Sequence, residues 1–495
     1  MTKTALAAWA LICAATPVFA QTDIANEIRD ISTPNEFKTT IGTLQFNQGR
    51  PTPKTVVQVY DQLDFIRGVE VFLNAMPGAS MVAMRRGQRS MGAADNTFVV
   101  FEQYLDSKTL FLTGATDSIY ASSFLDLSKG PVVLEYPPRA IGVLDDMWSR
   151  HIADFGDKGP DKGKGGKFLI VPPGYKGKLP SGYHLARSRT NGVWAIMLGL
   201  GAGSGDQSAG VMQILQSLKV YPLAAADNPP AVDVINASGN VANLVQSNGF
   251  SFFEDIASLV QEDPADVLDP ELTGQLAAIG IVKDKPFAPD ERMKRILTEA
   301  AAIGSASART MFFKPRDPAA TLYPDSAWTT PLVGGSTFLR NGVRLFDART
   351  AYHYGHAVVA PSLMTTAPGA GMQFAVAAMD ANGDWLDGGK LYRLQLPANV
   401  PAKESWSITL YDPQTRSLLQ TEALQPSLSS LNEKLKPAAD GSYELWFGPK
   451  APTGKEDSFL RTAPGKGWFA ILRLRGPTKP WFDKTWRPGE FEAMK

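Results

Sequence analysis

The sequence predicts a mixed, β-rich fold of two β-sandwich units, jelly-roll-like in character, with a mainly α-helical segment between them. Two regions, residues 96–193 and 371–476, consist of short β-rich runs bounded by Gly, Pro and Asp. Between them, residues 210–308 carry apolar side chains at helical spacing. The chain has 495 residues, 44% of them hydrophobic and 20% charged, which is enough apolar material for several cores.

The first twenty residues have the pattern of a secretory signal peptide. Lys3 supplies the positive start, an apolar stretch follows, and Val18-Phe19-Ala20 is a small-residue cleavage site. We expect cleavage after Ala20 and a periplasmic or secreted location; a membrane anchor is the alternative, but the run is too short to span a bilayer. The single cysteine, Cys13, lies inside this segment, so the mature chain would contain no thiol.

The remaining chain divides by its texture into four expected domains. A helical lead-in occupies residues 21–95, with a helix predicted to begin at Thr52-Pro53 and to end at Pro77-Gly78. The first sandwich follows at 96–200, a helical insert at 201–320, and the second sandwich at 321–495. Asp269 before a proline is the expected N-cap of one helix in the insert.

The two β-rich regions resemble each other in their spacing. Tyr120 to Asp126 matches Phe374 to Asp380, and Trp148 to Asp154 matches Trp406 to Asp412. We interpret these matches as a duplicated sandwich. The alternative is that β-turns of similar composition arose separately.

Long stretches of the chain resemble a bacterial family built from two domains of unknown function, 1254 at the N-terminal side and 1214 at the C-terminal side. The resemblance rests on IGTLQFNQGRPTPKTVVQVYDQLDF, SSFLDLSKGPVVLEYPP, LWFGPKAPTGKE and PGKGWFAILRLRGPTKPWFDKTWRPGE, among others. It implies a soluble exported protein with two β-sandwich units and a helical insert. It brings no assigned reaction and therefore no catalytic residue.

Nucleotide and hydrolase motifs are missing from the sequence. The stretch GDKGPDKGKGGK has no P-loop register, so its Lys162, Lys164 and Lys167 form either a cationic loop or a site that binds an anionic ligand. No cofactor is expected. Lys+Arg and Asp+Glu both number 49, which gives no reason to expect nucleic acid as a partner, and no apolar run suggests membrane insertion.

The segment DDMWSRHIADF contains further candidates for ligand binding. Read as a strand, it places Asp146, Trp148 and Arg150 on one face. The duplication then sets Arg150 where the second unit has Ile408, a core position. A guanidinium there needs a carboxylate partner, such as Asp146, or an anionic ligand.

Asp117 and Tyr120 stand at a polar turn that enters a strand. Asp117 is either an Asx turn or, with Tyr120 and Arg150, part of a pocket that offers acid, phenol and cation. His151 and His184 would be the bases in such a pocket, suited to β-elimination or hydrolysis.

His353 and His356 would share a helix face and could bind a metal, but a third ligand is not evident. Ordinary histidines are the favoured interpretation.

Two functions of different classes stay open. One is a periplasmic enzyme, a hydrolase or lyase, acting on a polar anionic or carbohydrate-like small substrate. The other is a non-catalytic protein that binds a small molecule or oligosaccharide, or that assembles into a homo-oligomer. The sequence does not decide whether the protein is an enzyme.

Overall fold

The structure is a computed structural model that describes residues 26–138, 140–200 and 217–494. The expected signal peptide, including Cys13 and the cleavage site after Ala20, lies outside the described residues, as does the start of the expected helical insert. No helix in the described part of the chain combines the length and apolar character needed to cross a bilayer. The chain divides into two units, residues 1–66 and 67–495.

The first unit contains a small antiparallel sheet in the order β1-β2-β3 and the start of a long helix. Helix α2 (Pro53–Asn74) begins where the sequence predicted, and the Thr52 hydroxyl accepts a hydrogen bond from the Thr55 N–H at 3.4 Å. The strands are β1 (Glu36–Thr39), β2 (Gly42–Asn47) and β3 (Arg50–Pro51).

The predicted stop at Pro77-Gly78 is wrong. Helix α2 ends at Asn74, and Pro77 and Gly78 lie in the first turn of the next helix, α3 (Met76–Ser90). Proline fits there because the first N–H groups of a helix need no partner within it.

In the second unit, residues 98–236 build two sheets that share one hydrophobic core. The larger has the order β14-β4-β6-β12-β8-β9 and the smaller β11-β10-β7-β13. Their strands are β4 (Phe98–Phe101), β6 (Ile119–Asp126), β7 (Val132–Tyr136), β8 (Ile141–Asp146), β9 (His151–Phe155), β10 (Gly166–Val171), β11 (His184–Arg187), β12 (Gly192–Leu200), β13 (Lys219–Pro222) and β14 (Val234–Asn236). β5 (Thr109–Leu110) and β15 (Ala242–Asn243) pair separately.

Residues 372–493 build a second pair of sheets around their own core. The orders are β18-β24-β20-β21 and β23-β22-β19-β25. Their strands are β18 (Met372–Ala377), β19 (Tyr392–Leu396), β20 (Ala402–Tyr411), β21 (Ser427–Ser429), β22 (Tyr443–Gly448), β23 (Phe459–Arg461), β24 (Phe469–Pro477) and β25 (Glu492–Ala493). A hairpin of β16 (Leu339–Arg340) and β17 (Val343–Arg344) precedes them.

The two pairs of sheets have corresponding strand orders. β6-β12-β8-β9 corresponds to β18-β24-β20-β21, and β11-β10-β7-β13 to β23-β22-β19-β25. In both small sheets the outer pair, β10 with β11 and β22 with β23, is parallel. A duplication would give this agreement, and the duplication itself stays a prediction.

The tryptophan spacing, however, does not mark equivalent positions. Trp406 lies inside β20, opposite Leu474 of β24, whereas Trp148 lies in the turn between β8 and β9. The reading of DDMWSRHIADF as one strand is therefore wrong, and Arg150 does not stand at the position of Ile408. The cause is the left-handed backbone of Ser149, with φ of 55°, which lets the chain reverse without a glycine.

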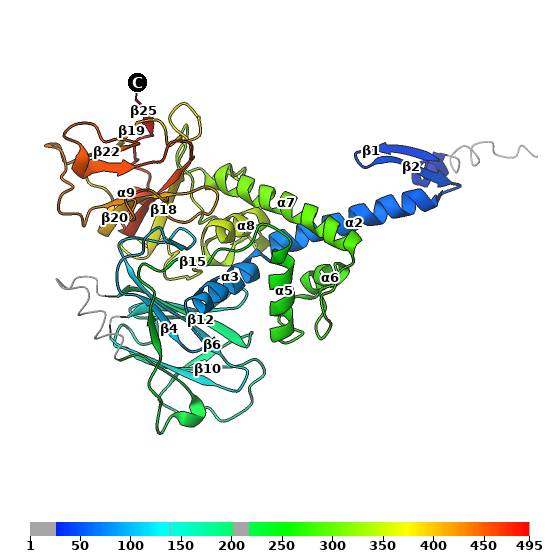
Figure 1. Ribbon diagram of the computed structural model, residues 1–495, viewed down its shortest axis with the longest axis horizontal. Coiled ribbons are helices and arrows are strands. Elements are labelled where there is room, and N and C mark those ends of the chain that lie inside the picture. The colour runs from blue at the N-terminus through cyan, green and yellow to red at the C-terminus, as the bar shows by residue number, and fades with distance from the viewer. Residues whose placement is uncertain (1–25, 139, 201–216, 495) are drawn as a thin grey trace, which may run out of the picture. The chain divides into compact units, whose positions relative to one another are not determined.

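Helices fill the region of the chain between the two pairs of sheets, and Figure 1 shows α3, α5, α7 and α8 grouped beside the strands. The Asp269 side chain caps α6, as predicted, by accepting from the Leu272 N–H at 2.9 Å. The helices are α5 (Ser251–Glu262), α6 (Pro270–Ala278), α7 (Glu291–Phe313), α8 (Phe346–Gly355) and the short α9 (Lys479–Phe482). Residues 210–216, where the helical texture was expected to begin, lie outside the described residues; in the described part that follows, residues 219–222, 234–236 and 242–243 are strands, and the next α-helix is α5.

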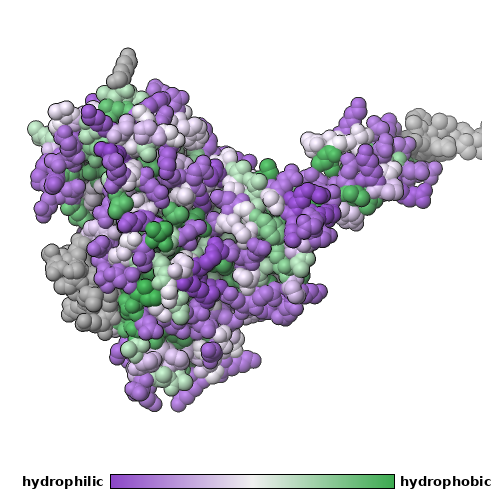
Figure 2. Space-filling view, in the orientation of Figure 1, coloured by the Kyte–Doolittle hydropathy of each residue, from purple (hydrophilic) through white to green (hydrophobic). Residues whose placement is uncertain are grey.

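The surface in the view of Figure 2 is largely hydrophilic, with hydrophobic residues gathered in limited patches. The candidate site lies at the contact between the two pairs of sheets.

Candidate functional site

Two arginine side chains of β24 project from the face of the sheet that is opposite to the core. In β24, Leu472 and Leu474 are buried in the core, so the alternation of a strand turns Arg473 and Arg475 to the other side. There the Arg473 Nη2 donates to the carbonyl oxygen of Thr113, 2.9 Å away and before β6 in the chain. Arg473 is only 5% exposed.

Arg475 pairs with Asp117 across the same contact. Its Nη2 lies 2.8 Å from Asp117 Oδ1 and also donates to the Ser118 hydroxyl. Burial opposes ionisation of Asp117, but the charges of Arg475 and Arg473 outweigh it and hold the pKa of Asp117 below its ordinary value. Asp117 is therefore a carboxylate with a partner, and its Oδ2 has no hydrogen bond.

Tyr120 and Tyr411 complete the polar part of the contact. The Ala115 N–H donates to Tyr120 Oη at 2.9 Å, and Tyr411 Oη donates to the Gly114 carbonyl at 2.9 Å. Burial raises the pKa of Tyr120, so its phenol is neutral.

A small cavity of about 80 Å³ lies at this contact. Tyr120, His356, Phe374 and Arg473 line it, from β6, the end of α8, β18 and β24. His356 is buried, and neither of its ring nitrogens has a hydrogen-bond partner. Burial, Arg473 and His353 lower the pKa of His356 to about 3, so its imidazole is neutral.

The charges around the cavity do not balance. Arg473 and Arg475 supply two cations, and Asp117 supplies one carboxylate, which pairs directly with Arg475. Among the described residues no carboxylate lies within ion-pair distance of Arg473, and its Nη1 has no hydrogen-bond partner. Burying a cation without a direct carboxylate partner is costly, and the charge of Asp117 offsets part of that cost for Arg473.

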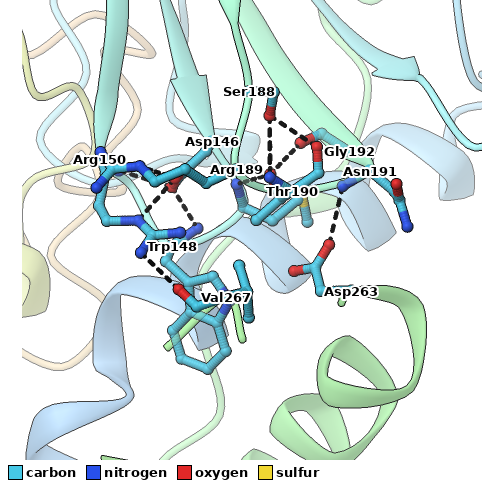
Figure 3. A network of polar contacts seen from close by, with 11 residues as sticks. Asp146, Trp148, Arg150, Ser188, Arg189, Thr190, Asn191, Gly192, Asp263 and Val267 are labelled. Atoms are coloured by element: carbon cyan, nitrogen blue, oxygen red, sulfur yellow. Dashed lines mark hydrogen bonds and ion pairs between the residues drawn. The ribbon is translucent and has the colours of Figure 1, made fainter. Parts of the chain in front are cut away.

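The structure thus places Tyr120 in the lining of the cavity and pairs Asp117 with Arg475, another lining residue, whereas Arg150 does not line the cavity. Figure 3 shows Arg150 in a network around Asp146, at the turn between β8 and β9. The Arg150 Nε donates to Asp146 Oδ2 at 2.6 Å, and its Nη1 donates to the Val267 carbonyl at 2.8 Å. Asp146 Oδ1 also accepts from the backbone N–H of Arg150 at 3.0 Å, so this pair holds the turn together.

Trp148 is packed against helix α3. A Cβ built on Gly78 would lie 2.9 Å from the Trp148 ring, so the glycine is what allows this close contact. Trp148 is thereby part of the interior.

The two candidate bases lie outside the cavity as well. His151 Nε2 is 3.2 Å from Asp154 Oδ2 on β9, and the His184 ring packs on Phe168, with centroids 5.5 Å apart. Neither lines the cavity of Tyr120.

The three lysine candidates do not converge. Lys167 pairs with Glu135 at 2.7 Å. Lys162 and Lys164 are exposed on a loop that Asp161 organises by accepting from the N–H of Gly156 at 2.8 Å.

The histidine pair does not form a metal site with other described residues. No group of three or more His, Cys, Asp and Glu side chains in the described ranges is placed to hold a metal. His353 Nδ1 instead contacts the Arg349 carbonyl at 2.9 Å, and burial lowers the pKa of His353 to about 4.

The residues that sequence reasoning missed are Arg473 and Arg475. The signal was present in FAILRLRGP, where two arginines alternate with leucines in a strand. Read alone, that pattern indicates a strand with one exposed face. Only the structure shows that the arginine face is covered by the first pair of sheets.

Two family models match parts of this chain. Residues 96–222 match the family "Protein of unknown function (DUF1254)", and residues 371–479 match "Protein of unknown function (DUF1214)". None of the curated proteins matches the chain.

Two solved structures match this chain, and the first of them is similar in its fold. The VPA0106 protein from Vibrio parahaemolyticus is 16% identical over 88% of this chain and 100% of its own, with a TM-score of 0.54. A putative uncharacterized protein from Burkholderia cenocepacia is 11% identical over 89% of this chain and 97% of its own, with a TM-score of 0.39. The DUF1254 match thus precedes the DUF1214 match in the chain, and residues from both matched regions line the small cavity.

Proposed function

We propose that the protein is an exported ligand-binding protein that holds the anionic group of a small polar molecule in the cavity between its DUF1254 and DUF1214 domains. Export is supported by the signal-peptide pattern that ends at Ala20. Anion binding is supported by one observation above all, the buried guanidinium of Arg473 without a carboxylate partner.

The chemistry of the lining favours a carboxylate as the bound group. Arginine presents a planar set of N–H donors that matches a carboxylate or a phosphate. Nη1 of Arg473 and Nε of Arg475 are both buried and have no partner in the described chain, so they supply unused donors. The neutral side chains of Tyr120 and His356 add polar groups to the lining without adding charge.

The size of the cavity limits what can enter it. About 80 Å³ admits several water molecules or one small group, because a single water needs roughly 10–15 Å³ on the same measure. An oligosaccharide could therefore place only an acidic substituent there.

An enzyme acting on such a ligand, a hydrolase or a lyase, is the second candidate, and His356 is the observation that favours it. A neutral imidazole with two unpartnered nitrogens could accept a proton next to a carboxylate held by Arg473. A pKa of about 3 makes His356 a weak base in the empty site. A bound carboxylate would raise that pKa by its charge. Binding is the better supported function, because it needs no such change.

Isothermal titration with small anions tests the proposal. Acetate, pyruvate and inorganic phosphate are titrated into the full mature chain, with acetamide as the neutral match of acetate. We expect saturable binding of at least one carboxylate and none of acetamide. Equal binding of acetate and acetamide, or no binding of any anion, would overturn the proposal.

A second measurement separates binding from catalysis. The anion that binds is incubated with the protein and followed by proton NMR in deuterated water. Exchange of its α-protons that disappears in His356→Gln would establish the proton transfer that a lyase needs. Binding without exchange would leave the ligand-binding function alone.

A further inference from the structure

A second, much larger cavity, of about 770 Å³, lies between helices α7 and α8 and the chain around Val333. Its walls are mostly apolar, with Ile303 and Met311 from α7 and Phe346 from α8. Ile303 is 47% exposed and Phe346 is 59% exposed, so large apolar side chains face solvent at this point. A cavity of this size, with predominantly apolar walls and polar side chains among them, has the usual form of a small-molecule site.

The rim of this cavity carries an excess of positive charge. Lys314, Arg316 and Arg344 line it together with Asp317 and Asp347. Both carboxylates already have partners, since Asp347 pairs with Arg316 at 2.8 Å and Asp317 with an arginine outside the lining at 2.8 Å. Lys314 and Arg344 form no ion pair with a carboxylate of any described residue; Arg344 donates to the Thr337 carbonyl, and Lys314 lies 3.5 Å from Met379 Sδ.

We propose that this cavity binds an anionic amphiphile, a carboxylate with an unbranched apolar chain. The chain would lie against the walls of α7 and α8, where each methylene removed from water favours binding. The carboxylate would lie at the rim, within reach of Lys314 and Arg344. A neutral apolar ligand would leave both cations unused, and a small polar anion would leave the apolar walls exposed to water.

This site is separate from the cavity of Arg473. Phe312 lines the large cavity and packs against His356 of the small one, with ring centroids 6.0 Å apart, so a side chain stands between them. The proposal therefore does not rest on the proposed function.

Titration of the full mature chain with dodecanoate, below its critical micelle concentration, tests the assignment. 1-Dodecanol is the probe with the same chain and a neutral head, and acetate is the probe without the chain. We expect saturable binding of dodecanoate and weaker binding of dodecanol. Arg473→Met, included as a variant of the other cavity, should bind dodecanoate as the unchanged protein does.

Two kinds of variant distinguish the rim from the walls. Lys314→Gln with Arg344→Gln should weaken dodecanoate binding about fivefold or more and leave dodecanol unaffected, because the substitutions remove only the two cations that would face the carboxylate of the ligand. Ala351→Phe, which fills the α8 wall, should abolish the binding of both. Lys403→Gln is the matched control, an exposed lysine outside the lining, and should change nothing.

The outcomes are decisive in either direction. No binding of dodecanoate up to its critical micelle concentration would overturn the proposal. The same dodecanoate affinity in the doubly substituted protein as in the unchanged protein would also overturn it. If Ala351→Phe fails to fold, the charge variants still decide it.

Discussion

Replacing Arg473 with methionine is the most direct test of the anion site. Arg473→Met keeps an unbranched apolar stem, shortens the side chain and removes its charge. The structure predicts two separate effects, one on folding and one on ligand binding, and they have different sizes.

The effect on folding should be small because two terms oppose each other. The charged hydrogen bond to the Thr113 carbonyl, worth about 1.5–3 kcal/mol, is lost. Removing a cation that is 5% exposed also removes a desolvation penalty of several kcal/mol. We expect the free energy of unfolding, measured by denaturant titration, to change by less than about 2 kcal/mol.

The effect on ligand binding should be large. Removing one partner of a buried charge pair costs about 2–5 kcal/mol, which is roughly thirtyfold to several-thousandfold in Kd. Isothermal titration of the carboxylate that binds best measures this loss. Arg473→Lys, which keeps the charge but not the planar donors, should recover part of the affinity.

A matched control makes the result specific to the cavity. Arg416 is also buried, at 1% exposure, but it packs over the Tyr354 ring and does not line the cavity. Arg416→Met should therefore leave the Kd unchanged in folded protein. Full affinity in Arg473→Met would refute the reasoning, since it would show that the buried cation does not face the ligand.

Three further predictions concern stability. Ile408 is fully buried in the second core, so Ile408→Ala should cost about 2–5 kcal/mol in chemical denaturation, and a loss below about 1 kcal/mol would contradict its burial. Arg150→Met should destabilise by about 1–3 kcal/mol, less than the loss of a fully buried pair, because the fully buried Asp146 keeps its backbone donors and a second arginine, Arg189, at 3.7 Å. The substitution should leave ligand affinity unchanged. A selective loss of ligand binding would show that Arg150 belongs to a binding site. The pKa of His356 is lowered from 6.5 to about 3 in the native state. Between these two values the unfolded state binds a proton that the native state does not, so the free energy of unfolding falls as the pH falls from about 6.5 towards 3. The contribution is about 2 kcal/mol between pH 7.5 and pH 5, and it should be missing from His356→Gln when the two unfolding curves are compared across pH; parallel curves would show that His356 is protonated in the native state.

Local patterns in the sequence predicted local structure well. The start of α2 at Pro53 and the cap at Asp269 follow from the first turn of a helix, which needs only neighbouring residues. The turn at Ser149 was missed because a serine with φ of 55° carries no sequence signal, and the alternation of DDMWSRHIADF continues through it. One such residue was enough to give Arg150 the wrong counterpart.

The candidate site was half predictable for the same reason. Asp117 and Tyr120 attracted attention as a polar turn before a strand. Their partner Arg475 lies 358 residues from Asp117 in the sequence, and no periodicity reports a contact of that separation. From the sequence alone, a cation on a strand indicates a solvent-exposed face, and only the structure shows that the first pair of sheets covers it.

The strand registers show that the polar groups of the cavity come from both pairs of sheets. Tyr120 of β6 is opposite Leu198 of β12, and Phe374 of β18 is opposite Arg473 of β24. If corresponding strands descend from one unit, Tyr120 corresponds to Phe374, and their cross-strand neighbours Leu198 and Arg473 correspond to each other. The aromatic character is kept in both, whereas only the second unit has a cation. The hydroxyl then comes from one domain and the guanidinium from the other, so neither domain alone supplies the groups that would bind an anion.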